Sequence, residues 1–173
     1  MNAPVLATPR LSLRPATLGD LAALHALFTD AQVRRWLFDD RVVSEAAARE
    51  IIEASTTSFA GRGFGHWVLV EPPGSPLFGC AGLFSADGIE IEILYAVHPS
   101  RWGHGFATEA ARAVLEHGFR ALALPRIAAR ADTPNVESIR LMERLGMRFE
   151  AERPIGGRPT VHYALTREEW ERG

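Results

Sequence analysis

The spacing of apolar residues predicts a series of strands. In these segments apolar residues either alternate with polar ones or form a short run between prolines, glycines and polar turns. The predicted strands are residues 10–15, 66–70, 77–84, 89–97, 126–132, 147–152 and 161–166. In 89–97, isoleucine at first alternates with glutamate, and the alternation stops at "LYAV". That break indicates either a bulge or a strand end that is buried on both faces.

Helical periodicity separates these strands. Apolar side chains recur every three or four positions, and residues able to cap a helix stand at the start. The predicted helices begin after Asp20, after Ser44 and after Asn135, with another over 105–122 and a short one within 30–41. Gly146 would end the helix that follows Asn135. The order of elements predicts a mixed α/β sheet with a strand–helix–strand crossover at its centre.

Length and composition predict one domain, residues 1–173, that is large enough to bury a core. A formal charge of -2 disfavours a nucleic-acid partner, and no apolar run approaches the ~18 residues of a membrane span. The single cysteine, Cys80, excludes an intramolecular disulfide. Together with the lack of a visible secretory signal, it favours a cytoplasmic location. All 19 basic residues are arginine, so chemistry that needs a lysine of the protein is excluded.

The stretch "HPSRWGHGFATEA", residues 98–110, combines a glycine-bearing turn with the start of a helix. The first turn of a helix presents unpaired backbone N–H groups at the positive end of the helix dipole. Gly103 and Gly105 would let an anion such as pyrophosphate approach these groups. The same glycines also suit a turn that only joins a strand to a helix, so the spacing alone leaves both interpretations open.

With other segments, this turn resembles the acetyl-CoA-binding core of the GNAT acetyltransferase superfamily, in particular its RimJ/RimL-like branch of ribosomal-protein N-terminal acetyltransferases. The superfamily motif Q/R-x-x-G-x-G/A aligns with "WGHGFA", residues 102–107. Tryptophan stands at the first position, as in the W-G-x-G-Y-A form of the branch, so no contact from a Gln or Arg side chain is expected there. The other similar segments are "TPRLSLRPAT", "LFGCAGL", "NVESIRLMERLGMRFE" and "VHYALTREEW".

The resemblance implies a GNAT-type mixed, mostly antiparallel sheet with a central splayed parallel strand pair, flanked by helices. The splayed strands would be 89–97 and 126–131, and the pantetheine arm of acetyl-CoA would enter between them. The pyrophosphate would lie on the N–H groups from Gly103 to Thr108. The cofactor-binding residues implied by the resemblance are Tyr95, Ala96, Val97, Trp102, Gly103, His104, Gly105, Phe106, Ala107, Thr108, Asn135 and Ser138.

A carboxylate on the strand 89–97 is the first catalytic candidate. An acceptor amine arrives as an ammonium and must lose a proton before it attacks a thioester, and a carboxylate can take that proton. The resemblance assigns this role to Glu92, because "EILY" matches the E-I-G-Y of the branch. Glu90 lies on the same face of the strand and remains its rival. Either residue would also suit an ordinary exposed position on a strand.

Ser138 is the second catalytic candidate. It lies three residues after Asn135, where serine is also ordinary capping chemistry. The resemblance implies that the two side chains face the CoA arm and that the serine hydroxyl meets the leaving thiolate as an acid. Members outside the branch often use a tyrosine further along this helix, but here "LMERLG" holds none, which favours Ser138.

The remaining candidates border the site or have ordinary structural roles. No H-x-x-x-H or C-x-x-C spacing occurs, so no metal is expected, and Cys80 is interpreted as a buried core thiol. His104 would border the phosphates, and whether it contacts them stays open. Trp36, Phe38 and the loop 153–160 are expected to border the acceptor.

We therefore expect an N-acetyltransferase that moves an acetyl group from acetyl-CoA to a primary amine by direct attack in a ternary complex. The acceptor would be a peptide N-terminus or a small amine, and a homodimer is possible. The alternative is an inactive acyl-CoA-binding or regulatory module of the same fold. A dinucleotide-binding module is disfavoured, because the glycine turn comes late and Asp132, after the strand 126–131, is only a weak match to the required acidic residue.

Overall fold

The computed structural model describes residues 3–72, 74–85 and 88–173, and their strands form one eight-stranded sheet in the order β1-β2-β3-β4-β5-β6-β8-β7. The strands are β1 (Leu6–Ala7), β2 (Ser12–Pro15), β3 (His66–Val70), β4 (Gly79–Phe84), β5 (Glu92–Val97), β6 (Arg126–Asp132), β7 (Arg148–Glu152) and β8 (Thr160–Thr166). The helices are α1 (Leu21–Thr29), α2 (Ala31–Leu37), α3 (Glu45–Arg62), α4 (Phe106–Glu116), α5 (Val136–Arg144) and α6 (Arg167–Arg172). Short 3-10 turns lie at Leu18–Asp20 and Pro99–Arg101, and a π-helical turn follows α4 at His117–Ala121.

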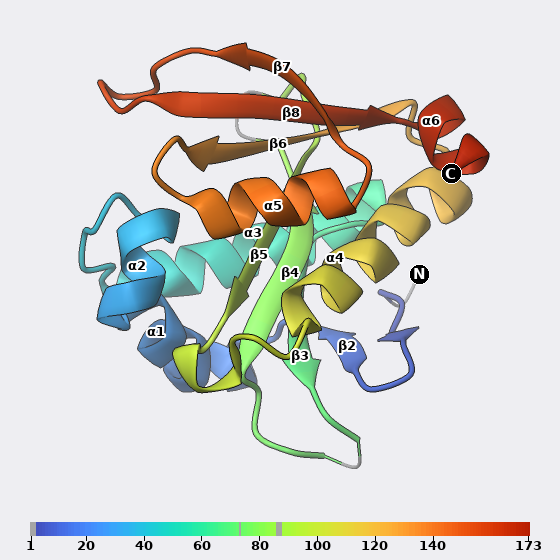
Figure 1. The fold of residues 1–173 in the computed structure, drawn as a ribbon. Coiled ribbons are helices and arrows are strands. Elements are labelled where there is room, and N and C mark those ends of the chain that lie inside the picture. Colours follow the sequence, from blue (N-terminus) through green and yellow to red (C-terminus); the bar gives the residue numbers. More distant parts are fainter. Residues whose placement is uncertain (1–2, 73, 86–87) are drawn as a thin grey trace.

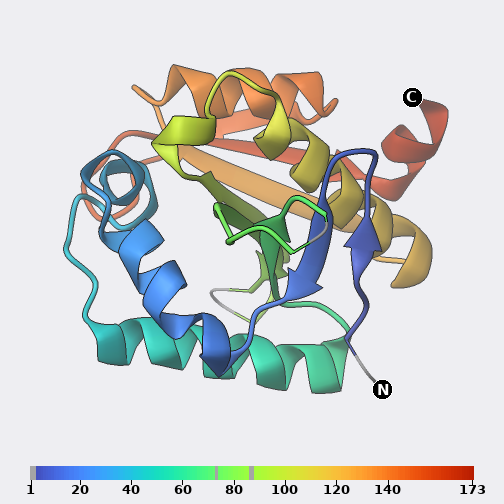
Figure 2. The ribbon, with the colours of Figure 1, turned by 90° about the horizontal axis from the view of Figure 1, so that it is seen from below.

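Helices cover both faces of the sheet. Figures 1 and 2 show α4 and α5 on one face, and α1, α2 and α3 on the other. Each face of the sheet has its own hydrophobic core. The strands contribute side chains to both cores, because neighbouring residues of a strand point to opposite faces. On β3, Trp67 and Leu69 pack into the core beneath α4 and α5, whereas Val68 packs into the core beneath α1 and α3.

The centre of the sheet opens between its two parallel strands. The paired strands of the sheet are antiparallel except for β5 and β6, which run parallel. Within the described chain β5 and β6 pair at a single register position, Glu92 with Ala128, and then diverge. The expected fold, a mostly antiparallel mixed sheet with a splayed parallel pair, is therefore confirmed.

The strand predicted at 89–97 is shorter in the structure, because β5 begins at Glu92. Ile89 is 88% exposed, so the alternation of its segment does not report a buried strand face. The break at "LYAV" is also not a bulge toward β4. The register runs without a shift from Phe84 opposite Glu92 to Gly79 opposite Val97. The break instead marks the part of β5 that borders the gap.

Most helix starts follow the predicted capping chemistry. The Ser44 hydroxyl accepts from the backbone of Ala47, and the Asn135 amide oxygen accepts from the backbone of Ser138. Asp20 differs from the prediction, because its carboxylate binds Arg14 rather than capping α1 through its side chain. None of the helices in the described ranges is both long and apolar enough to cross a membrane.

Candidate active site

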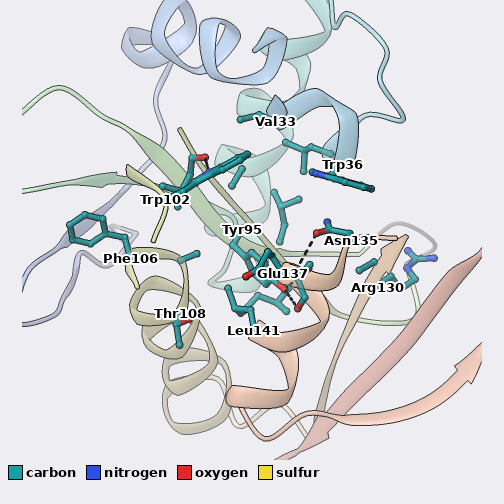
Figure 3. Close-up of a pocket in the computed structure, with 18 of the residues that line it drawn as sticks. Val33, Trp36, Tyr95, Trp102, Phe106, Thr108, Arg130, Asn135, Glu137 and Leu141 are labelled. Atoms are coloured by element: carbon teal, nitrogen blue, oxygen red, sulfur yellow. Dashed lines mark hydrogen bonds between the residues drawn. The ribbon is translucent and has the colours of Figure 1, made fainter. Parts of the chain in front are cut away.

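A cavity of about 1290 Å³ follows the gap between β5 and β6. Its walls come from α2, β5, the turn before α4, the start of α4, the end of β6, α5 and the β7–β8 hairpin. In Figure 3, Trp102, Phe106 and Thr108 lie at one end, Trp36 and Arg130 lie at the other, and Tyr95 lies between them. Almost all of the residues expected to bind the cofactor line this cavity.

Backbone groups of β5 face the gap at alternate residues. The backbone N–H of His98, just after β5, donates to the carbonyl of Phe78, just before β4, so these two facing residues form a hydrogen-bonded pair. In an antiparallel ladder such pairs recur at every second residue. The backbone groups of Ala96 therefore point to β4, whereas those of Tyr95 and Val97 point into the gap. Of the three residues expected to pair with pantetheine through their backbone, two are oriented for it, and Ala96 contributes only its side chain to the cavity wall.

Trp102 anchors the turn to the end of β5. Its indole N–H donates to the Val97 carbonyl at 2.6 Å, and its side chain remains 46% exposed along the cavity. The sequence offered no partner for this tryptophan. The structure assigns it a positioning contact: it occupies the Val97 carbonyl and leaves the Val97 N–H directed into the gap.

The glycines of the turn adopt the left-handed conformation that favours glycine. Gly103 has φ 78° and Gly105 has φ 77°, and α4 begins at the next residue, Phe106. A Cβ at Gly103 would meet nothing within 4 Å, and one at Gly105 would meet only the Arg10 guanidinium at 3.6 Å. The backbone beside the N-terminus of α4 is therefore open to an anion.

His104 turns away from the cavity. Its ring stacks on Phe106 with centroids 5.8 Å apart, and its Nδ1 lies 2.8 Å from the Trp102 carbonyl. Its own carbonyl accepts from Arg10 at 2.9 Å. Because His104 is not among the described residues that line the cavity, the expected role of its side chain at the phosphates has no geometric support.

Glu92 lies at the narrow part of the gap, in an ion pair with Arg130. Its side chain is 5% exposed, and Arg130 donates to both of its carboxylate oxygens, with Nε 2.5 Å from Oε2. Both residues line the cavity. Glu90, its rival, joins Arg126 in a network with Glu150 and is not among the cavity residues that the structure describes.

Ser138 meets the side chain of Tyr95 across the gap. The two hydroxyl oxygens are 2.8 Å apart, and both residues line the cavity. Burial raises the pKa of Tyr95 to about 12. The sequence argument used only the backbone of Tyr95. The sequence did contain a signal for the direction of the Tyr95 side chain. Tyr95 lies three residues after Glu92, and residues an odd number apart on a strand face opposite sides.

The chain matches a known family over most of its length. Residues 10–148 match the model of the acetyltransferase (GNAT) domain. The uncharacterized N-acetyltransferase YoaA of Bacillus subtilis (strain 168) is 31% identical over 149 residues, which cover 85% of this chain and 84% of the relative. The chain belongs to the GNAT acetyltransferase family. It is an acetyl-CoA-dependent acyltransferase, as its kinship with N-acetyltransferases indicates.

Solved GNAT structures share the fold and hold the coenzyme. A spermidine N-acetyltransferase from Vibrio cholerae, in complex with CoA and spermine, is 20% identical with a TM-score of 0.79, covering 95% of this chain and 99% of that one. A RimL ribosomal L7/L12 α-N-protein acetyltransferase in complex with CoA is 18% identical with a TM-score of 0.79, covering 94% and 98%. At these identities the likeness shows the fold and does not choose a branch of the family.

Acetyl-CoA fits the residues of this GNAT enzyme. The gap presents strand-like backbone groups for an amide-bearing arm, and the turn at Gly103 and Gly105 presents an open backbone beside a helix N-terminus for phosphates.

The described residues bring together no group of three or more side chains able to hold a metal ion. Cys80 is buried on β4, and burial raises the pKa of its thiol to about 12.

The other end of the cavity is walled by α2 and the β7–β8 hairpin. Trp36, Ile155 and Thr160 line it, and all three belong to the segments expected to border the acceptor. Phe38 differs from the expectation, because its ring packs on Phe28 with centroids 5.2 Å apart and lies outside the described lining of the cavity.

Proposed function

We propose that this GNAT enzyme transfers the acetyl group of acetyl-CoA to an α-amine at a peptide or protein N-terminus, as in the RimJ/RimL-like branch. The observation that carries the proposal is the continuity of the cavity. The same cavity is lined by the glycine turn before α4, by α2 and by a carboxylate, that of Glu92. Donor and acceptor can therefore occupy the site together, so the amine attacks the thioester directly in a ternary complex.

Glu92 acts as the base in this proposal. The Arg130 guanidinium favours the ionised carboxylate, which is the form that accepts a proton. A carboxylate offers about four acceptor sites, and the contacts from Arg130 use two of them. The amine gives up its proton to Glu92, directly or through water, and its lone pair attacks the acetyl carbon.

Two negative charges develop during the reaction, one on the carbonyl oxygen and one on the leaving sulfur, and a different group stabilises each. The Val97 N–H points to where the carbonyl oxygen becomes an oxyanion, and a positioned backbone donor stabilises such charge. When the C–S bond breaks, its electron pair passes to sulfur. The Ser138 hydroxyl donates to this thiolate, whose pKa of about 8.5 lets it leave without full protonation.

The preference for an α-amine follows from the cost of deprotonation. At pH 7, freeing an amine of pKa about 8 costs about 1.4 kcal/mol, against about 4.6 kcal/mol for a lysine side chain of pKa about 10.4. The proposal gives the role of base to one carboxylate, Glu92, and one carboxylate suits the cheaper deprotonation.

A matched pair of peptides tests the acceptor. One has a free α-amine and a blocked lysine, and the other has the reverse, and release of free CoA thiol is followed at pH 7.5. Faster reaction of the α-amine peptide is expected, and faster reaction of the lysine peptide would refute the preference. Failure of both peptides alongside turnover of a small amine such as spermidine would replace the peptide acceptor by a small molecule.

A further inference from the structure

We propose that Tyr95 is a positioning residue that donates its phenolic hydrogen to Ser138 Oγ and so directs the serine hydroxyl hydrogen at the leaving thiolate. The inference rests on the proposed role of Ser138 and adds a second residue, on another element, that makes this role possible. It starts from the 2.8 Å separation of the two hydroxyl oxygens.

The direction of this hydrogen bond decides where the serine hydrogen points. If Ser138 donated to Tyr95, its only hydrogen would face β5, and the phenol would have to donate to the Ser138 carbonyl at 3.4 Å, which is long for an O–H donor. If Tyr95 donates to Ser138 Oγ, the shorter contact is satisfied and the serine hydrogen is available to the cavity, which both residues line. The second arrangement makes better use of the observed distances.

The surroundings of Tyr95 keep it a donor. Its ring packs against the core beneath α4 and α5, so the hydroxyl is held in place from β5. Because its pKa is raised to about 12 by burial, the phenol stays protonated throughout the range in which an amine is acetylated. Tyr95 therefore gives a hydrogen bond and not a proton, and it returns unchanged after each turnover.

Ser138 is held from the other side by its own helix. Its backbone N–H donates to the Asn135 amide oxygen at 3.2 Å, in the first turn of α5. The N-terminal end of a helix also favours negative charge nearby. As the C–S bond breaks, negative charge develops on sulfur and is shared with Ser138 Oγ through its hydrogen bond. The hydrogen bond from Tyr95 strengthens as that charge grows, so it stabilises the transition state more than the bound substrate.

Tyr95 and Glu92 thus divide the reaction between the two faces of β5. They are three residues apart on the strand, so their side chains lie on opposite faces of β5. Tyr95 points toward α5, where its hydroxyl meets Ser138 (Figure 3), and Glu92 lies on the other face, where it pairs with Arg130. The amine would lose its proton on one face, and the thiolate would be stabilised on the other.

A double-mutant cycle tests the inference. Tyr95→Phe, Ser138→Ala and the combined variant are compared with the native enzyme by steady-state kinetics, using any amine that the native enzyme acetylates. Tyr95→Phe is expected to lower kcat about tenfold or more, the effect of a lost hydrogen bond to a charged group, and to change the KM for acetyl-CoA less than about twofold. The combined variant is expected to be no slower than Ser138→Ala alone, because Tyr95 acts through Ser138.

Tyr163→Phe is the matched control. Tyr163 is the other tyrosine of the chain, it packs in the same core, and its hydroxyl bonds Glu143 outside the described cavity lining. It should lose a hydrogen bond with little change in kcat. If the effects of Tyr95→Phe and Ser138→Ala multiply, or if Tyr95→Phe matches the control, the inference is overturned. If Ser138→Ala alone is without effect, the proposed role of Ser138 fails first, which is a distinguishable result.

A second measurement does not depend on kinetics. In the Tyr163→Phe background Tyr95 is the sole tyrosine, so fluorotyrosine incorporation labels it alone. Replacing Ser138 by alanine should shift its ¹⁹F resonance, since the hydrogen-bond partner is lost. An unchanged resonance would overturn the inference even if the kinetic variants of Tyr95 failed to fold.

Discussion

Adding one methyl group at Gly105 would test whether the turn before α4 binds the pyrophosphate of acetyl-CoA. Gly105 has φ 77°, and a Cβ there would lie 3.6 Å from the Arg10 guanidinium, an ordinary contact, with no closer atom among the described residues. The folded protein therefore tolerates Gly105→Ala sterically. Its cost to the free energy of unfolding should be the left-handed backbone strain alone, about 1–2 kcal/mol.

The bound coenzyme should tolerate the same methyl group much less. The space outside Gly105 is the space that a phosphate needs in order to reach the first N–H groups of α4. Loss of a charge-assisted hydrogen bond together with steric crowding should weaken CoA binding by at least about 2 kcal/mol, or about 30-fold in Kd. Isothermal titration calorimetry with CoA measures the effect directly.

Gly146→Ala is the control for backbone strain. Gly146 has φ 82°, a Cβ there would meet nothing within 4 Å, and it lies after α5 outside the described cavity lining. It should lower the melting temperature about as much as Gly105→Ala and leave Kd unchanged. His104→Ala should also leave Kd within about twofold, because its ring faces Phe106. A folded Gly105→Ala variant with native affinity would refute the pyrophosphate assignment, and equal weakening by Gly146→Ala would assign the effect to strain.

Four further variants test the acceptor side and the fold. Glu92→Gln should lower turnover about 10²–10⁴-fold at neutral pH, with a smaller deficit as pH approaches the pKa of the amine, while Glu90→Gln stays near the native rate. If pH–rate profiles showed the reverse order, the role of base would pass to Glu90. Trp36→Ala should raise KM for the acceptor more than KM for acetyl-CoA, since Trp36 lines the end of the cavity beyond Glu92, and equal changes in initial-rate kinetics would contradict this. Asp20→Asn should lower the melting temperature at neutral pH, because the hydrogen bond from Arg14 lowers the pKa of Asp20 below its ordinary 3.8. That stabilisation is complete above about pH 4 and is lost as pH falls through the lowered pKa, so the melting curves of variant and native protein should converge in acid.

Local features of this protein were readable from the sequence because their causes are local. Strands 66–70 and 126–132 have the predicted bounds, since short apolar runs between turn residues can bury themselves in few other ways. Ser44 and Asn135 cap their helices as predicted, because a cap involves residues only three apart. The open glycine turn before α4 is local in the same sense.

Prediction failed where a neighbouring element decides the outcome. The alternation of 89–91 suggested a continuing strand, yet β5 begins only at Glu92 and Ile89 is exposed. Alternation records which side chains could share a face, and it does not record whether a neighbouring element covers that face.

The chemistry of the site depended most on the tertiary structure. The sequence determined that a carboxylate stands on the central strand and a serine in the first turn of a later helix. Only the fold decided that Arg130, 38 residues from Glu92, holds that carboxylate, and that Tyr95, 43 residues from Ser138, meets its hydroxyl. Such contacts join residues on different elements, and their geometry is set by how β5, β6 and α5 pack around the gap. Periodicity along one element carries no information about that packing.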